Sequence, residues 1–569
     1  MTDARTIQVR FLPEGAEVDV LPGTTILEAA GRANIIVETP CGGAGTCGQC
    51  RVRVLQNAPP PSPMEERSFS RTELAAGWRL ACQARVTAAV TVEVPASSRF
   101  LGQKILAHGV DGKYSLEPCV ALDPDDRAGR LLGAAFDIGT TTLVGALLDL
   151  ASDETLATAS RANPQIPLGD DVIARIAQAG RPGGLAQLRS LVIDCVNEMI
   201  AEMCAAAGVA TESVYEVTFA GNTTMNHLLL GIDPTPLAHA PYKAVLLESC
   251  AVPAPEFGLR IRPTGQAYTL PNIAGFVGGD TVGVILAAAM QEHDGIELAL
   301  DIGTNGEIVL GGRDRLVACS TAAGPAFEGA RIRQGMRAAR GAIEKVLLDG
   351  ADVQVHVIGG APARGLCGTG VIDAVAALLD AGIVDSSGRM LPPDELPSAL
   401  PDALRRRVIE QDGQVAFELV RADDASGGRP VRLTQRDVRE VQLGKAAFLA
   451  GATIILREYG IAPEQLDRVL LAGAFGNFLR ARSVLRIGLM PPLPESRVEF
   501  IGNAAGTGAR MVLADRSCRE AAEWIAKHTE YVELAGRSDF QEEFASALMF
   551  PEQDSPRMNT DKEEMNIEH

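Results

Sequence analysis

The sequence has few aromatic residues, no long apolar run and fewer basic than acidic residues. Aromatic residues make up only 4% of the 569 positions, whereas 58 glycines indicate many tight turns. No apolar stretch reaches the roughly 18 residues of a membrane span, and no basic start before an apolar segment marks a signal peptide. Lys and Arg number 52 against 72 Asp and Glu, and the net charge of −20 disfavours binding to nucleic acids or anionic membranes. These features predict a cytoplasmic protein.

The remaining composition is that of a folded, multidomain chain. Hydrophobic residues at 46% and charged residues at 22% are typical of proteins with sizeable cores, which excludes disorder over most of the length. At roughly 150 residues per domain, the length predicts three or four domains. The eleven cysteines are unevenly spread, because four lie in the first 95 residues and the rest are scattered. In a cytoplasmic chain we expect free thiols, metal ligands or redox groups instead of disulfides.

The first 95 residues predict a small domain of strands and one short helix. Residues 6–11 and 16–21 alternate like two strands of a hairpin, and Thr25 to Glu28 read as a capping box that opens a helix through residue 33. RVRVL and VTVEV predict two further strands, and the segment GWRLAC leads into the second of them. The alternation of strands and loops predicts an α+β domain.

Cysteine spacing in this domain indicates a metal cluster. Cys41, Cys47 and Cys50 follow the pattern C-x5-C-x2-C in a glycine-rich loop, and Cys82 comes later in the segment GWRLAC. Four thiolates hold a [2Fe–2S] cluster, whereas structural zinc sites usually use two paired cysteine knuckles, and Cys82 has no close partner. We therefore favour a [2Fe–2S] cluster over zinc. Residues 1–95 resemble the β-grasp [2Fe–2S] ferredoxins, and residues 96–130 are expected to be a linker.

Two copies of one turn mark the large remaining region. LLGAAF and TLVGALLDL predict strands on either side of Asp137-Ile-Gly-Thr-Thr, and LAL and GEIVLGG flank Asp301-Ile-Gly-Thr-Asn in the same way. Two copies of one turn so far apart in the chain, at Asp137 and Asp301, predict two related lobes with a cleft between them. We place the first lobe at residues 131–212 and the main lobe at 213–535, followed by a C-terminal extension at 536–569. We expect the end of that extension to be disordered because it is polar and acidic.

The repeated turn has the groups needed to bind phosphate. A carboxylate at the end of a strand can orient Mg²⁺ or its waters, while backbone N–H groups and a hydroxyl can bind phosphate oxygens. Gly139 and Gly303 allow close approach because they lack a Cβ atom. A simple hairpin turn is the alternative for one copy, but two copies between apolar strands favour phosphate. Further glycine turns follow strands downstream, and the one from Gly473 through Gly476 is a candidate adenosine pocket.

The order of motifs resembles a known family. Paired D-x-G-T turns look like the acetate/sugar kinase, Hsp70 and actin (ASKHA) superfamily. The series GWRLAC, DIGTTT, AGNTTM, DIGTNGE, AGPAFEGA, LCGTGVID and LAGAFGN resembles the reductive activators of corrinoid proteins from about residue 6 to about residue 530. The resemblance implies a [2Fe–2S] ferredoxin domain fused to a two-lobed α/β ATPase. It also implies ATP and Mg²⁺ binding, a corrinoid protein or corrinoid-dependent methyltransferase as partner, and a homodimer.

Site residues follow from the same resemblance. The family uses the first turn for Asp137 and Thr140, and the second for Asp301, Thr304 and Asn305. We expect Asp137 and Asp301 to be catalytic. The expected nucleotide-binding residues are Gly139, Thr140, Thr141, Gly303, Thr304, Asn305, Gly473 and Gly476, and the expected cluster ligands are Cys41, Cys47, Cys50 and Cys82. The activity implied is ATP-dependent reduction of Co(II) corrinoid to Co(I), with electrons from an upstream donor that the sequence does not name.

Three alternatives remain at this stage. The first is a small-molecule kinase of the same superfamily that carries a regulatory cluster. The second is a dehydratase-type activator whose cluster is held by cysteines of the ATPase, and Cys319 and Cys367 are the best pair for it. An electron carrier with an inactive nucleotide fold is the third. For Cys319 and Cys367 we favour buried, structural thiols.

For four other polar residues the sequence gives only weaker evidence of a role at the nucleotide or metal site. Lys445 lies on a helix opened by Thr434 and could face the cleft, although the helix spacing indicates a core helix. Glu328 could contact the nucleotide or simply begin a helix. Asp170 and Asp171 could approach a metal or lie in solvent.

Overall fold

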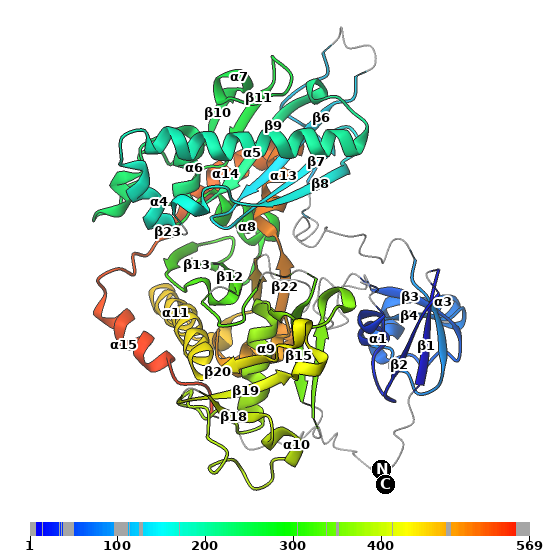
Figure 1. The fold of residues 1–569 in the computed structure, drawn as a ribbon. Coiled ribbons are helices and arrows are strands. Elements are labelled where there is room, and N and C mark those ends of the chain that lie inside the picture. The colour runs from blue at the N-terminus through cyan, green and yellow to red at the C-terminus, as the bar shows by residue number, and fades with distance from the viewer. Residues whose placement is uncertain are drawn as a thin grey trace, which may run out of the picture.

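The fold is described by a computed structural model of the chain (Figure 1). It describes residues 7–13, 15–33, 35, 37, 50–95, 112, 114–123, 129–169, 171–303, 305–329, 331–336, 338, 340–348, 352–411, 413–473 and 479–552. Within these ranges, no helix is both long and apolar enough to cross a membrane. Three units follow one another along the chain, and each is built around its own sheet.

The N-terminal unit is a five-stranded mixed sheet accompanied by three short helices. Its strand order is β2-β1-β5-β3-β4, where β1 pairs antiparallel with β2 and parallel with β5. The Thr25–Glu28 capping box is present, because the Glu28 amide donates to Thr25 Oγ1 and the Thr25 amide donates to Glu28 Oε2. The predicted hairpin and helix are confirmed. The elements are β1 (Ile7–Leu12), β2 (Ala16–Val20), α1 (Ile26–Arg32), β3 (Arg51–Gln56), α2 (Pro63–Ser68), α3 (Arg71–Ala75), β4 (Trp78–Leu80) and β5 (Val90–Glu93).

The second unit contains a six-stranded sheet in the order β10-β11-β9-β6-β7-β8. The long helix α5 (Gly184–Ala207) crosses its outer face, as Figure 1 shows, and packs Leu188 and Val192 against Phe136 and Phe219. The strands are β6 (Leu132–Ile138), β7 (Thr142–Asp149), β8 (Glu154–Ala162), β9 (Val214–Gly221), β10 (Cys250–Pro253) and β11 (Gln266–Thr269), and the other helices are α4 (Val172–Ala179), α6 (Thr223–Leu230) and α7 (Ala254–Phe257).

The third unit repeats this design with a sheet in the order β22-β21-β12-β13-β14-β23. Helix α11 (Gln435–Tyr459) covers its outer face, where Ile454 packs with Leu300 and Ile308. The strands are β12 (Glu297–Ile302), β13 (Gly306–Gly311), β14 (Leu316–Thr321), β21 (Arg468–Ala472), β22 (Val498–Gly502) and β23 (Thr529–Tyr531).

Two small sheets, β16-β15-β17 and β18-β19-β20, extend the third unit. Their strands are β15 (Ala342–Leu348), β16 (Val353–Val357), β17 (Gly365–Leu366), β18 (Val408–Gln411), β19 (Gln414–Val420) and β20 (Val431–Thr434), accompanied by α9 (Gly368–Asp380), α10 (Asp402–Arg405) and α12 (Ala481–Ile487).

Three helices form a layer shared by the two large sheets. They are α8 (Gly279–Ala288), α13 (Ala504–Ala514) and α14 (Arg516–His528), and they lie between the sheets in Figure 1. One apolar cluster contains Ala135 and Leu148 of the first sheet, Ala299 and Val309 of the second, and Val282 of α8. Because this cluster joins both sheets, the two lobes are packed through α8, α13 and α14.

The sheets do not divide where the sequence placed the lobes. Strand β9 pairs in parallel with β6, with Ala134 opposite Val217. The boundary after residue 212 therefore cuts the first sheet, which continues to Thr269. The main-lobe range also includes α13, which packs against β6 and β9 of the first sheet.

The linker and the C-terminal extension are partly described. In the linker, the Tyr114 hydroxyl donates a hydrogen bond to Asp153, and the backbone of Glu117 forms an isolated parallel β-bridge with that of Asp515. These contacts fix this part of the linker to the second unit and to the start of α14. In the extension, α15 (Ser538–Ala547) packs along α11. Most of the predicted disordered end, roughly residues 551–569, lies outside the described residues, which stop at 552.

Candidate functional site

Two of the four predicted cluster ligands lie side by side in the N-terminal unit. The Sγ atoms of Cys50 and Cys82 are 3.3 Å apart, and both residues are buried. The pairing of β3 with β4, with Arg51 opposite Leu80, brings them together, and the Ala81 amide donates to the Cys50 carbonyl at 2.8 Å. Cys41 and Cys47 lie outside the described residues. The two described thiols form half of a cysteine site that fits an iron–sulfur cluster.

A buried glutamate that the sequence analysis missed supports this site. Glu65 is 0% exposed, and its Oε1 accepts from the Leu80 amide at 2.8 Å, two residues before Cys82. Its Oε2 accepts from the Ser62 amide at 2.7 Å as part of a capping box on α2. Glu65 therefore holds β4 in place beside the cysteines. The Ser62-x-x-Glu65 pattern is readable in the sequence, but the long-range bond to Leu80 is not.

Both repeated turns lie at the ends of hairpins, as predicted. In the first, the Gly139 amide donates to the Thr142 carbonyl at 3.0 Å, and in the second the Gly303 amide donates to the Asn305 carbonyl at 3.2 Å. A Cβ atom on Gly139 would lie 2.7 Å from the Thr142 oxygen, so a larger residue does not fit there. Because the glycine amides close the hairpins, phosphate would be bound by the next amides, those of Thr140 and Thr141. The structure gives these two amides no partner among the described residues.

The first turn is held from three other segments. Asn222 donates its side-chain amide to Thr140 Oγ1 at 3.0 Å, and Asn163 donates to the Gly139 carbonyl at 2.8 Å. The fully buried Arg175 donates to the Thr140 carbonyl and, at 2.9 Å, to the Gly169 carbonyl. These contacts fix the conformation of the turn.

Four carboxyl groups from different elements interact electrostatically near the two turns. Asp137 lies on β6, Asp301 on β12, Glu307 on β13 and Asp280 in the first turn of α8. Burial raises the pKa of Asp137 to about 8, helped by the charges of Asp280 and Asp301, while a hydrogen bond from Asn503 opposes the rise. Burial together with Asp280 raises the pKa of Asp301 to about 7.

The other two carboxyl groups behave in the same way. Burial raises the pKa of Asp280 to about 6, although the hydrogen bonds that it accepts from the Thr281 amide and hydroxyl lower the pKa. Burial, together with the charges of Asp280 and Asp301, raises the pKa of Glu307. Within the described residues no three such groups converge closely enough to bind one metal ion by themselves. Buried acids that raise one another's pKa values favour a bound cation, because a cation offsets their repulsion.

Three helices begin at this cluster. Asn222 caps α6, Asn503 caps α13, and α8 begins at Gly279. A Cβ atom on Gly278 would lie 2.4 Å from the Thr223 amide, so the start of α8 lies directly against the start of α6. Helix N-termini carry partial positive charge and free N–H groups, which favour anions such as phosphate. The site thus combines acids for a cation with helix ends for an anion, as a metal–nucleotide complex requires.

The second turn has fewer described residues. Glu328 ends a 3-10 helix (Pro325–Glu328), and its Oε1 would be 3.8 Å from a Cβ atom on Gly303, which places its carboxylate beside the turn. Gly473 follows β21, and its amide donates to the Gly502 carbonyl at 3.0 Å. Thr304 and Gly476 lie outside the described residues.

Several weaker candidates lie elsewhere. Lys445 is fully buried and its Nζ donates to the Met549 carbonyl, so it packs against the C-terminal segment and not into the cleft. Asp171 caps α4, and Asp170 lies outside the described residues. Cys319 lies inside β14, and Cys367 begins α9 and contacts the Ile343 carbonyl. Both cysteines are buried, as the structural interpretation predicts, and burial raises the pKa of each thiol.

Family models match the chain in three consecutive parts. A 2Fe-2S iron–sulfur cluster binding domain matches residues 9–87, the middle region of RACo matches 132–293, and the C-terminal ASKHA domain of RACo matches 295–562. RamQ of Eubacterium limosum, a corrinoid activation enzyme, is 36% identical over 428 residues, which cover 75% of this chain and 71% of RamQ. The chain belongs to the family of reductive activators of corrinoid proteins.

Other relatives agree with this assignment. A solved reductive activator for a corrinoid, iron–sulfur protein matches with a TM-score of 0.68 and 33% identity, over 96% of this chain and 99% of that one. The Co(II) methylated amine-specific corrinoid protein reductase of Methanosarcina barkeri is 24% identical over 459 residues, 75% of this chain and 78% of that protein. The predicted fold class, the [2Fe–2S] cluster and ATP binding by an ASKHA domain are confirmed.

Proposed function

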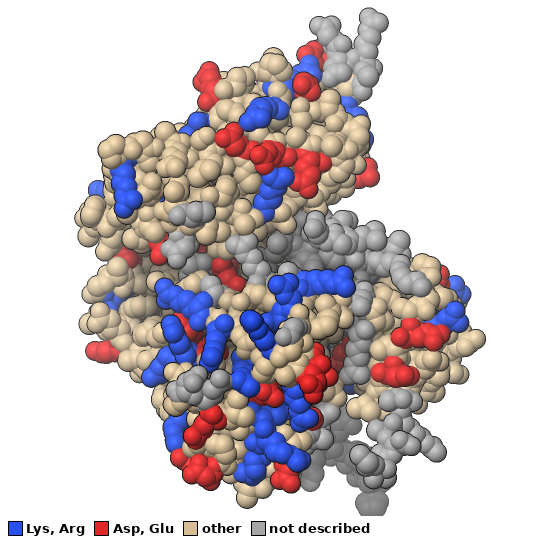
Figure 2. All heavy atoms as spheres, viewed as in Figure 1, with Lys and Arg blue, Asp and Glu red and all other residues tan. Residues whose placement is uncertain are grey.

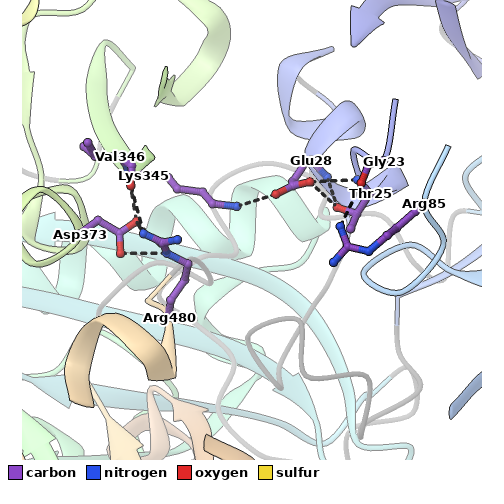
Figure 3. A network of polar contacts seen from close by, with 8 residues as sticks. All are labelled: Gly23, Thr25, Glu28, Arg85, Lys345, Val346, Asp373 and Arg480. Atoms are coloured by element: carbon purple, nitrogen blue, oxygen red, sulfur yellow. Dashed lines mark hydrogen bonds and ion pairs between the residues drawn. The ribbon is translucent and has the colours of Figure 1, made fainter. Parts of the chain in front are cut away.

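We propose that this activator transfers single electrons to the Co(II) corrinoid of a partner protein, producing Co(I), and that ATP hydrolysis drives the process. The observation that carries the proposal is the direct contact between the two functional units. Lys345 Nζ on β15 of the ASKHA domain lies 3.3 Å from Glu28 Oε1 on α1 of the iron–sulfur domain (Figure 3). The Leu27 amide beside Glu28 donates to the Ala81 carbonyl, next to Cys82. The electron site and the ATPase are therefore linked within one chain.

The iron–sulfur domain would hold the cluster through Cys41, Cys47, Cys50 and Cys82. A bound [2Fe–2S] cluster takes up and releases one electron at a time. The buried positions of Cys50 and Cys82 keep their sulfurs away from bulk water, and Glu65 fixes the strand that leads to Cys82. The chain's own contribution, as far as it is described, is a buried pair of cysteines beside a strand that Glu65 fixes.

The electron transfer needs an energy source. Co(I) is a strong reductant, and plant-type [2Fe–2S] centres have potentials near about −400 mV. Each ~59 mV of deficit costs a factor of ten in the equilibrium constant of a one-electron step. ATP can supply the difference only through states of the activator that differ in affinity for the partner. A nucleotide site shared by two lobes, which α8 and α13 join, can produce such states.

The nucleotide would lie between the two turns. Thr140 and Thr141 would bind phosphate through their amides, and Asp137, Asp280 and Asp301 would hold Mg²⁺ through its waters, which lowers their pKa values toward the ionised form. Gly303, Thr304 and Asn305 would bind from the second lobe, and Gly473 and Gly476 would contact the adenosine. A homodimer, a separate electron donor and a cytoplasmic location belong to this proposal as well.

The test is direct. The purified, cluster-loaded chain is mixed with ATP, Mg²⁺, a low-potential reductant and the Co(II) form of a corrinoid protein, and the Co(I) absorption band is followed. Two probes are the methylated-amine-specific corrinoid protein and the corrinoid iron–sulfur protein. We expect Co(I) with at least one probe, and none with Asp301→Ala, which should lose ATP hydrolysis by orders of magnitude but keep its iron.

Each rival predicts a different result. A small-molecule kinase would give a phosphorylated product without any corrinoid protein. A dehydratase-type activator would lose both iron and activation in Cys319→Ala/Cys367→Ala, whereas we expect that variant to keep both. Production of Co(I) without ATP hydrolysis would favour the electron carrier.

A further inference from the structure

One face of the ASKHA domain is rich in arginine, although the net charge of the chain is −20. Figure 2 shows Lys and Arg gathered over this domain. Seven arginines of this domain are exposed, and none of them forms an ion pair with a carboxylate among the described residues. We call these seven residues the arginine face. Its members are Arg331, Arg333, Arg340, Arg364, Arg429, Arg436 and Arg439.

These arginines lie on three segments, one around Arg333, one from Arg429 to Arg439 and one around Arg364, and hydrogen bonds join the segments. The Arg333 amide donates to Asp437 Oδ1 at 2.7 Å, which places residues 331–336 at the start of α11, beside Arg436 and Arg439. Gln334 Nε2 donates to the Pro430 carbonyl at 3.0 Å, next to Arg429. The face is therefore continuous from α11 to the segment before β20.

The third segment continues the face toward β15. The Arg364 amide donates to the Gly341 carbonyl at 2.8 Å, so Arg364 lies beside Arg340. A Cβ atom on Gly359 would lie 2.9 Å from Arg340 Cγ, which shows that the stem of Arg340 runs along that glycine. Arg340 and Gly341 lead directly into β15, whose Lys345 contacts Glu28 of the iron–sulfur domain. The arginine face thus borders the contact with the iron–sulfur domain.

Elsewhere on the same domain, arginines are paired. Arg389 forms a double hydrogen bond with Glu395, Arg407 pairs with Asp352, and Arg432 pairs with Glu418. Unpaired arginines placed close together repel one another, because at physiological salt the charges interact over about 8 Å. Such a face is maintained at a cost in stability unless an anionic partner covers it.

We propose that the arginine face docks an acidic surface of the corrinoid protein, next to the iron–sulfur domain that delivers the electron. This inference rests on the proposed function. Guanidinium groups bind carboxylates in a planar, two-point geometry. Nucleic acid is disfavoured by the overall charge of −20.

The experiment reverses two charges on the exposed side of α11. Arg436→Glu/Arg439→Glu is compared with Arg181→Glu/Arg516→Glu, a control with the same change in net charge on the second unit and α14. Arg181 and Arg516 are also exposed, and neither pairs with an acid among the described residues. All proteins are used full-length with cluster, and basal ATP hydrolysis and the iron–sulfur spectrum show that each variant is folded.

The readout is the rate of Co(I) formation against the concentration of the two Co(II) corrinoid probes, at low and high salt. We expect the face variant to raise KM by about tenfold or more at low salt with kcat little changed, because charge reversal slows association. The difference should shrink at high salt, and Arg436→Lys/Arg439→Lys should restore most of the affinity.

Each contrary outcome has its own meaning. If the wild type reduces a probe and the face variant has the KM of the control, the docking inference is overturned and the proposed function stands. If the wild type reduces neither probe, the proposed function and the docking inference fall together. A change in sedimentation of the face variant alone, or competition by single-stranded RNA, would assign the face to self-association or to nucleic acid and overturn the inference.

Discussion

At the residue scale, the acids near the two turns are partly or fully buried, and none of them has an ion-pair partner among the described residues. The pKa of Asp137 is raised from 3.8 to about 8 by burial and by the charges of Asp280 and Asp301. A carboxyl group whose pKa is raised on folding is protonated in the folded chain at pH values where it is ionised in the unfolded chain. Its contribution to stability is fully present below pH 3.8 and is lost as the pH rises toward 8.

The variant Asp137→Asn tests this burial. The amide keeps the size of the side chain but cannot ionise, so in the nucleotide-free protein its melting temperature should exceed that of the wild type at pH 8. The gap should narrow steadily as the pH is lowered toward 4. Calorimetry or dye-based melting across this range measures it, and a gap that does not depend on pH would show that Asp137 is not buried among acids.

The cysteines offer a second residue-scale prediction. Cys50 and Cys82 have sulfurs 3.3 Å apart, whereas Cys319 lies alone inside β14 with its Sγ 4.0 Å from the Gly451 carbonyl. Cys50→Ser should lose or distort the visible iron–sulfur absorption and abolish electron transfer, while ATP hydrolysis continues. Cys319→Ala is the matched control and should keep the iron of one [2Fe–2S] cluster per chain. Normal iron content in Cys50→Ser would remove Cys50 from the ligand set.

At the element scale, the close crossing of α8 and α13 decides how the two lobes meet. A Cβ atom on Gly508 would lie 2.3 Å from Gly283 Cα, and one on Gly283 would lie 3.0 Å from the Ala505 carbonyl oxygen. The helices approach so closely because these positions carry no side chain. The crossing fixes where α8 presents Asp280 and where α13 presents Asn503, the two helix ends nearest Asp137.

Adding one methyl group at this crossing should therefore disturb the site. Gly508→Ala should push α8 and α13 apart, lowering the free energy of unfolding by about 1–3 kcal/mol and reducing ATP hydrolysis more than that loss alone explains. Gly180→Ala is the control, since its added Cβ would meet Thr235 Cγ2 at 3.2 Å, at the C-terminal end of α4 and outside the crossing of α8 and α13. Chemical denaturation and ATPase assays provide both numbers. Equal effects of the two variants on ATPase activity would show that the crossing does not position the site.

At the scale of the whole molecule, a partly buried ion pair between Lys345 and Glu28 joins the iron–sulfur domain to the ATPase. Burial tends to raise the pKa of Glu28, but the Lys345 charge and the hydrogen bonds from Thr25 outweigh it, and the pKa of Glu28 is lowered. On the other side, Val346 next to Lys345 is tied to Arg480 and Asp373 (Figure 3). Arg480 begins α12, just after the glycine turn that starts at Gly473. Strand β15 thus contacts both Arg480 of the ATPase and Glu28 of the iron–sulfur domain.

A charge swap tests whether this contact holds the domains together. Lys345→Glu should release the iron–sulfur domain, because Glu28 would then face a like charge. A half-exposed ion pair contributes only about 0.2–1 kcal/mol, so the global melting temperature should hardly change. Small-angle scattering should show a larger radius of gyration, and Lys345→Glu/Glu28→Lys should restore it. An unchanged radius for the single variant would mean that other contacts dock the domain.

The sequence alone determined the features that depend on short spacing. The hairpin and capping box before the cysteines, the C-x5-C-x2-C loop and both D-x-G-T turns are local patterns, so their strands and helices could be assigned without knowing what packs against them. The sequence also identified Asp137 and Asp301, because a polar residue at the end of an apolar strand stands out. The roles of these residues and of the nucleotide-binding set remain predictions for the experiments above.

Tertiary structure decided what distant segments bring together. Asp280, Asn503 and Arg175 reach the turns from three separate helices, and no sequence pattern links them, because their meeting depends on how α8, α13 and α4 pack. Lys445 looked free to face the cleft, but the C-terminal segment covers it. The arginine face and the Glu28–Lys345 contact likewise join residues far apart in the chain. Local spacing fixes elements, whereas burial and charge at a site are sums over neighbours that only the folded chain supplies.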